Sequence, residues 1–163
     1  KAYNDAYGFA RGDRVIKIIA DILVNVVHSK GSRGDFIGHI GGDDFVIITT
    51  PECSDSICEN IIKEFDRVAP EMYSDEERKA GYIYTTSRKG ETQCFPLMTI
   101  SMGVVTNEHR EMKNHLDVGE IAAEMKKRAK AIKGSSYVKD DYIESDKEDG
   151  SETVPDTRLD SDI

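Results

Sequence analysis

The feature that most constrains this chain is a short acidic turn between two β-rich runs. Residues 41–44 read Gly-Gly-Asp-Asp, with one run at 36–40 before them and another at 45–50 after them. Both runs are rich in Phe, Ile and Val, which favour strands, whereas Gly and Asp are typical of tight turns. The pattern therefore predicts a β-hairpin whose tip carries two adjacent carboxylates.

The residue types at this tip suit phosphate and metal chemistry. Gly41 and Gly42 allow positive φ and leave room for a phosphate chain against the backbone. Asp43 and Asp44 would repel each other in an empty site, and a hard divalent cation bound together with substrate phosphates would relieve that repulsion. The same residues are also compatible with a plain surface hairpin, because Gly and Asp dominate such turns.

Apolar periodicity predicts the rest of the fold. Helical spacing indicates helices over residues 10–29, about 54–68 and about 118–132. Residues 74–79 are predicted to be a loop or a short helical turn, followed by a strand at 82–86, a turn at 88–91 and a strand at 94–105. Tyr137 and Val138 are expected to add an edge strand. This order predicts an α+β domain with an antiparallel sheet flanked by helices.

Charge and composition limit the class of protein. Ten acidic and two basic residues between positions 140 and 163 account for −8 of the formal net charge of −9. We therefore expect a near-neutral domain over residues 1–140 and an acidic, disordered tail over 141–163. The charge argues against a nucleic-acid binder. No apolar run approaches the ~20 residues that span a bilayer.

The beginning of the chain and its cysteines bear on the cellular location of the protein. The first residues carry no apolar signal segment, and the chain begins at Lys1 rather than Met, which suggests a fragment. Cys53, Cys58 and Cys94 have no CxxC spacing, so reduced thiols are expected. Together these features predict a cytoplasmic protein without direct membrane insertion.

Four blocks of sequence, in order over roughly residues 1–138, resemble the GGDEF domains, the diguanylate cyclases of bacterial signalling. Gly41-Gly42-Asp43-Asp44-Phe45 is similar to the family signature, in the variant form GGDDF. Residues 1–13, KAYNDAYGFARGD, resemble the family segment Lys-x-x-Asn-Asp-x-x-Gly-His-x-x-Gly-Asp. Residues 99–103 resemble its Thr-x-Ser-x-Gly strand, and Lys130 falls near its late phosphate-binding lysine.

The resemblance implies a reaction, a fold and a partner. Two GTP molecules would condense to cyclic di-GMP with loss of pyrophosphate, in a homodimer that holds one GTP per subunit. Two Mg²⁺ ions per GTP site are implied, with Mn²⁺ as the alternative ion, and a sensory or receiver domain upstream. The fold would be the palm-like antiparallel sheet of nucleotidyl cyclases, with its first strand missing from this chain.

The resemblance also implies roles for individual residues. Asn4 and Asp13 would recognise guanine, and Asp43 would bind magnesium while Asp44 assists catalysis. The substrate phosphates would lie near Lys1, Lys130 and the backbone of Gly42. Each residue also has a structural interpretation: Asn4 as a turn or cap residue, Asp13 as a first-turn acid favoured by the helix dipole, and Lys130 as a solvated helix lysine.

The chain departs from the family pattern at four places. Asp44 replaces the usual Glu, which withdraws the carboxylate by one methylene group. Gly134-Ser135-Ser136 occupies the stretch where a late phosphate-binding Arg is expected, and Lys133 is a possible substitute that lacks the planar fork of Arg. In the inhibitory Arg-x-x-Asp site Asp35 is present but Ser32 replaces the Arg, so weak or absent feedback binding is predicted. The first metal-binding Asp of the family would precede Lys1.

These departures leave two further hypotheses beside the cyclase. One is a catalytically degenerate GGDEF domain that binds GTP as a regulatory module, and the other is a purely structural dimerisation module. Two histidine patterns also stay open. His39 stands where an Arg is common in the family or is simply a strand residue. His109 and His115 form a weak metal site or belong to a solvated polar loop.

Overall fold

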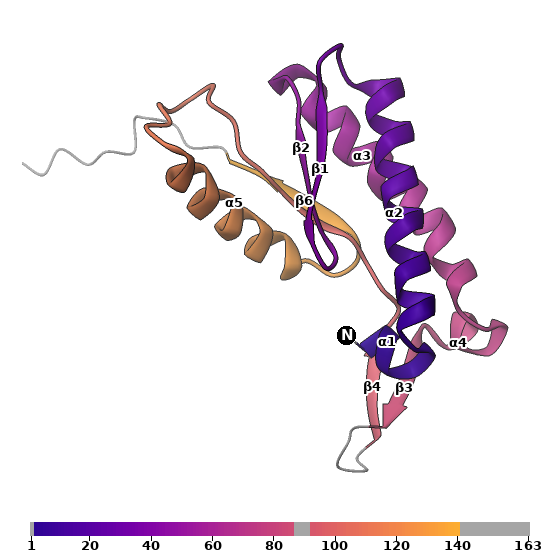
Figure 1. Cartoon of the computed structure of the whole chain (residues 1–163). Coiled ribbons are helices and arrows are strands. Elements are labelled where there is room, and N and C mark those ends of the chain that lie inside the picture. The colour runs from indigo at the N-terminus through magenta and orange to yellow at the C-terminus, as the bar shows by residue number, and fades with distance from the viewer. Residues whose placement is uncertain (1, 87–91, 141–163) are drawn as a thin grey trace, which may run out of the picture.

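The computed structural model describes residues 2–86 and 92–140, and its elements combine helices with short strands (Figure 1). The helices are α1 (Ala2–Tyr7), α2 (Phe9–Lys30), α3 (Pro51–Val68), α4 (Asp75–Ala80) and α5 (His115–Lys130), with a 3₁₀ turn, η1, at Ala69–Met72. The strands are β1 (Phe36–Gly41), β2 (Asp44–Ile48), β3 (Tyr82–Thr86), β4 (Thr92–Pro96), β5 (Ser101–Val104) and β6 (Ser136–Lys139). The predicted α+β class is confirmed. The expected turn at 88–91 and acidic tail at 141–163 lie outside the described residues.

The packing of α2 against α3 forms the main hydrophobic core. The apolar stripe predicted for α2 is confirmed, because its buried side chains repeat at helical spacing. The buried residues of this core are Ile22, Leu23, Val26 and Val27 of α2, Ile57, Ile61 and Phe65 of α3, and Ala69. Helix α3 begins at Pro51, three residues earlier than predicted, because proline is well suited to the first helical position. This early start ends β2 at Ile48.

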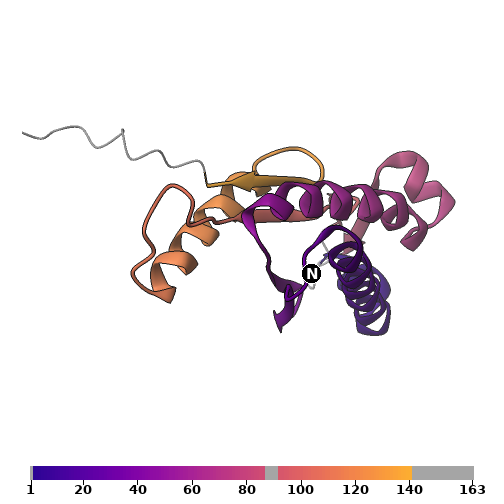
Figure 2. The same ribbon diagram turned by 90° about the horizontal axis from the view of Figure 1, so that it is seen from above.

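The hairpin of β1 and β2 has one half-buried and one exposed face. Ile37, Phe45 and Ile47 pack against the core. The opposite face carries apolar side chains that are largely exposed: Phe36 (55%), Ile40 (74%), Val46 (37%) and Ile48 (62%). Figures 1 and 2 show the hairpin between α5 and α2.

The strands form three separate pairs within the described residues, whereas a single antiparallel sheet was expected. β1 pairs with β2 and β3 with β4, both antiparallel, and β5 pairs with β6 in parallel. The strand predicted over residues 94–105 is broken, because β4 and β5 belong to different pairs. In this break Met98 N–H donates to Tyr73 Oη at 2.9 Å and Ile100 N–H donates to Ser135 Oγ at 3.1 Å. Side chains thus take the place of a ladder partner.

Helix α5 connects the two parallel strands and packs on β5. Its first turn is capped by Asn114 Oδ1, which accepts hydrogen bonds from the N–H groups of Leu116 and Asp117. The helix therefore begins before the predicted Val118 and ends before Ile132. The apolar spacing placed both of these residues on the inward face, but they are exposed. Met125 and Ala129, which the same spacing placed there, are buried as predicted.

No helix within the described ranges 2–86 and 92–140 is long and apolar enough to cross a membrane. The three cysteines form no disulfide with one another: Cys58 is buried, Cys53 half-buried and Cys94 exposed.

Candidate functional site

The acidic turn is a two-residue loop at the end of the hairpin. Gly41 pairs with Asp44, so that Gly42 and Asp43 form the loop. Gly42 has φ of 59°, in the left-handed region that glycine adopts without strain. The predicted hairpin is therefore confirmed, with its glycine at the position that requires one.

His39 braces this turn. Its Nε2 lies 3.0 Å from the carbonyl oxygen of Gly42 and donates to it. Its ring stacks on Phe45, with ring centres 4.6 Å apart and an angle of 19° between the planes. Phe45 in turn packs against the core. The interpretation of His39 as a strand residue fits these contacts, because the ring supports the turn from within the hairpin.

The two carboxylates at the tip have different surroundings. Asp43 is exposed, whereas Asp44 forms an ion pair and a hydrogen bond with the ammonium group of Lys126 on α5. This hydrogen bond and the charge of Lys126 hold the pKa of the Asp44 carboxyl below its usual value, and the charge of Lys130 acts in the same direction. The lysines of α5 therefore offset the negative charge of Asp44.

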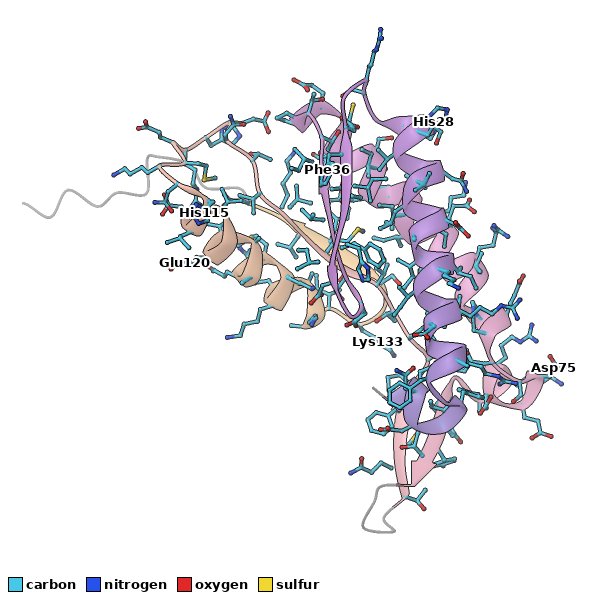
Figure 3. All side chains as sticks on the ribbon, viewed as in Figure 1. His28, Phe36, Asp75, His115, Glu120 and Lys133 are labelled. Atoms are coloured by element: carbon cyan, nitrogen blue, oxygen red, sulfur yellow. The ribbon has the colours of Figure 1, made fainter. Side chains whose placement is uncertain are left out.

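A close contact between α5 and β5 places these lysines. A Cβ atom on Gly103 of β5 would lie 2.6 Å from the backbone nitrogen of Lys126 and 2.8 Å from the carbonyl oxygen of Ala122. Only glycine allows the helix to lie this close to the strand. Figure 3 shows His115 and Lys133 at opposite ends of the helix, with Lys133 at the end nearer the hairpin tip. The C-terminal half of α5 therefore faces the turn.

The packing of α1 against α2 brings Asn4 to Gly12, the residue before Asp13. Asn4 lies within α1 rather than in a turn or a cap, and its side chain rests on Gly12, next to Asp13. Gly8 separates the two helices with φ of 83°. Figures 1 and 2 both show the beginning of α1 near the hairpin. Lys1 lies outside the described residues.

Comparison with known proteins identifies the family. The family model described as "Diguanylate cyclase, GGDEF domain" matches residues 1–136. This chain belongs to the GGDEF family. No curated protein and no solved structure matched it. Members of this family are diguanylate cyclase-type domains of cyclic di-GMP signalling, and its enzymes generally use divalent metal ions.

The donor groups of this GGDEF domain suit a magnesium ion only in part. Magnesium prefers oxygen ligands and is usually held by one or two carboxylates together with substrate phosphates and water. Asp43 and Asp44 provide such carboxylates at an exposed tip. Among residues 2–86 and 92–140, no group of three His, Cys, Asp or Glu side chains could hold a metal. His109 lies in the segment before α5, whereas His115 is the first residue of that helix.

The carboxylate of Asp35 in the GGDEF domain is held by hydrogen bonds from neighbouring residues. This carboxylate accepts hydrogen bonds from the backbone N–H of Ser32 at 2.8 Å, from Ser32 Oγ at 2.6 Å and from Thr49 Oγ1 at 2.8 Å. The bonds from Ser32 and Thr49 hold the pKa of this carboxyl below its usual value. Ser32 stands at the arginine position of the inhibitory Arg-x-x-Asp site. It binds Asp35, the aspartate of the same site.

Two features of the site escaped sequence reasoning. The first is Lys126, whose only sequence signal is its spacing of one helical turn from Lys130. The second is a tyrosine cluster that anchors α1: Tyr3 Oη donates to Met72 O at 3.1 Å, and Tyr7 Oη donates to Glu77. Tyr3 also packs edge-on against Tyr73, with ring centres 5.4 Å apart. This cluster holds the helix that carries Asn4.

Proposed function

We propose that this GGDEF domain is a diguanylate cyclase, which condenses two GTP molecules to cyclic di-GMP in a homodimer. The observation that carries the proposal is the juxtaposition of the acidic turn and the lysines of α5. Carboxylates that suit a divalent cation thus lie beside ammonium groups that suit phosphates. A site for a metal–nucleoside triphosphate needs both kinds of group.

In the proposed reaction, the 3′-oxygen of one GTP forms a bond to the α-phosphorus of the other. The bond from that phosphorus to the bridging oxygen breaks, and pyrophosphate leaves with the electron pair. The hydroxyl proton passes to a nearby base or to water, and a second, equivalent step closes the ring. Each subunit contributes one GTP, which is why the reaction requires a homodimer.

Different residues of this chain would bind the guanine, the phosphates and the metal. Asn4 and Asp13 would hydrogen-bond guanine, since a carboxylate accepts well from its adjacent N1–H and N2–H donors. Lys1 and Lys130 would contact phosphates, and Gly42 lets the triphosphate approach the backbone. Asp43 would hold magnesium, which when bound polarises the phosphoryl group. Asp44 would accept the hydroxyl proton or orient that hydroxyl.

A second function, GTP binding in a regulatory module without turnover, is favoured by one observation. Asp44 is one methylene shorter than the usual glutamate and is paired with Lys126. A carboxylate in such a pair is a weaker base, because its pKa is lowered. In either case we propose that an upstream sensory or receiver domain controls the domain, and that it acts in the cytoplasm.

The test uses the full-length protein with GTP and Mg²⁺, and with Mn²⁺ in a parallel assay. We expect cyclic di-GMP to form, and Asp43→Ala to lower the rate by roughly a thousandfold, because several kcal/mol of metal-assisted stabilisation would be lost. Asp21→Ala, which removes an exposed aspartate from α2, is the matched control and should retain the rate.

Three results would decide among the hypotheses. GTP binding without product would support the regulatory module and reject the cyclase. Loss of GTP affinity in Asp13→Ala would support the guanine role in either case. A protein without any GTP affinity would reject both functions and leave the dimerisation module.

A further inference from the structure

Two lysines of α5 lie on the same side of the helix. Lys126 and Lys130 are one helical turn apart, and both act on Asp44, the first by a direct ion pair and the second by its charge. Their side chains therefore form a small basic patch against the acidic turn. Of these two lysines, only Lys130 corresponds to a residue that the family resemblance marks as phosphate-binding.

A second phosphate-binding cation was expected in the stretch Gly134-Ser135-Ser136. The serines there form hydrogen bonds within the domain. Ser135 Oγ donates to Asp66 on α3 and accepts from the N–H of Ile100. Ser136 is buried, and its hydroxyl donates to the carbonyl oxygen of Ala129 at 2.8 Å. These serines carry no charge and bind other parts of the domain, so they cannot replace an arginine at the triphosphate.

Lys126 is well placed to supply the missing charge. It lies on the face of α5 that Gly103 brings against β5, so its backbone position is fixed by the packing of the helix. Its side chain is 37% exposed and that of Asp44 is 53% exposed. An exposed ion pair of this kind is weak, so the ammonium can exchange Asp44 for another anion at little cost.

We propose that Lys126 is a phosphate-binding residue of this domain, paired with Asp44 until nucleotide arrives and then bound to the triphosphate. The proposal rests on the proposed function, because it assigns a residue to the same GTP site. It also makes Lys126 a competitor of the divalent cation, since both neutralise the acidic turn. A cation that binds the turn weakens the Lys126–Asp44 pair just as the anionic triphosphate arrives with it.

This dual role predicts two effects of opposite sign when the charge is removed. Without Lys126, the turn keeps an uncompensated negative charge and should bind a divalent cation alone more tightly. The same change should weaken nucleotide binding, because one charge-assisted contact to phosphate is lost. A lysine that merely stabilised the fold would lower both affinities together.

The experiment compares Lys126→Met with Lys127→Met in the full-length protein. Methionine keeps an unbranched chain without the charge, and Lys127 is an exposed neighbour on the same helix. Mn²⁺ alone is titrated by electron paramagnetic resonance. Binding of 3′-deoxy-GTP with Mg²⁺ is measured by calorimetry, because this analogue lacks the attacking hydroxyl and cannot condense.

For Lys126→Met we expect roughly tenfold weaker 3′-deoxy-GTP binding, the effect of one charged hydrogen bond, together with tighter Mn²⁺ binding. Lys126→Arg should retain most of the nucleotide affinity, and Lys127→Met should change neither affinity. Unchanged nucleotide affinity in Lys126→Met, or equal losses in Lys126→Met and Lys127→Met, would overturn the proposal. If the wild type bound 3′-deoxy-GTP and only Lys130→Met weakened it, this inference alone would fail. A wild type that bound no nucleotide would reject the proposed function itself.

Discussion

Gly12 of α2 lies against Asn4 of α1 so closely that a Cβ atom on Gly12 would stand 1.9 Å from Asn4 Oδ1. The glycine thus lets the candidate guanine-binding helix rest on α2. Gly12→Ala should displace Asn4 and lower the free energy of unfolding by about 1–3 kcal/mol, the usual cost of overpacking. Thermal unfolding and GTP titration would measure both consequences.

The control for this substitution is Gly119→Ala on α5. Gly119 is also helical, but a Cβ atom there would meet no atom within 4 Å. Since alanine is favoured over glycine within helices, this variant should gain about 0.5–1 kcal/mol. If both alanine variants were equally stable, the close contact between Asn4 and Gly12 would be disproved.

The turn around Asp35 predicts a dependence of stability on pH. A carboxyl whose pKa is lowered in the folded state stabilises the fold above its unfolded pKa of about 3.9, and this contribution is lost as the pH falls through the folded value. Asp35→Asn should therefore lower stability at pH 7 and change it less below pH ~3. Urea unfolding at several pH values would show this.

The donor side of the same turn offers a second measurement. Ser32→Ala removes the hydroxyl that donates to Asp35 and should raise the pKa of the Asp35 carboxyl toward its ordinary value. The shift can be followed by NMR titration of the carboxyl carbon. An unchanged pKa would mean that the Ser32 hydroxyl does not hold this carboxylate.

The cysteines should differ strongly in reactivity. Burial raises the pKa of the Cys58 thiol to about 12, whereas Cys94 is exposed on β4. Because the thiolate is the reactive form, iodoacetamide should modify Cys94 in the native protein and Cys58 only after unfolding in urea. Peptide mass spectrometry would locate the labels, and rapid native labelling of Cys58 would contradict its burial.

The core between α2 and α3 predicts a contrast between two isoleucines. Ile61 is 0% exposed, whereas Ile132, just beyond α5, is 50% exposed. Ile61→Ala should cost about 2–5 kcal/mol of unfolding free energy and Ile132→Ala less than about 0.5 kcal/mol. Chemical unfolding of the two variants measures this difference directly. Similar costs would mean that the helix pair is not the main core.

Local patterns predicted the elements better than their assembly. The stripe of α2 and the glycines of the turn are properties of adjacent residues, and both were confirmed. By contrast, residues 94–105 alternate like one strand, yet the chain moves from the pair with β3 to the pair with β6 within them. Partner choice depends on distant residues, so the alternation alone could not reveal the break.

The candidate site shows the same division. Family motifs placed Asp43, Asp44 and Lys130, and the structure brings Asp44 within the influence of Lys130. Lys126 is separated from Asp44 by 82 positions and has the sequence character of an ordinary surface lysine. Its contact with Asp44 follows only from the packing of α5 on β5, which depends on Gly103. No pattern of neighbouring residues in the sequence predicts the contact between Lys126 and Asp44.

The outer face of the hairpin has a consequence for handling the protein. Phe36, Ile40 and Ile48 expose most of their apolar surface on a two-stranded ribbon, and ribbons of this kind tend to pair with other chains. A preparation of residues 1–163 alone should therefore self-associate as the protein concentration rises. Light scattering would detect this at low salt and neutral pH. A charged substitution such as Ile48→Lys, at the end of the hairpin away from the acidic turn, would then improve colloidal behaviour.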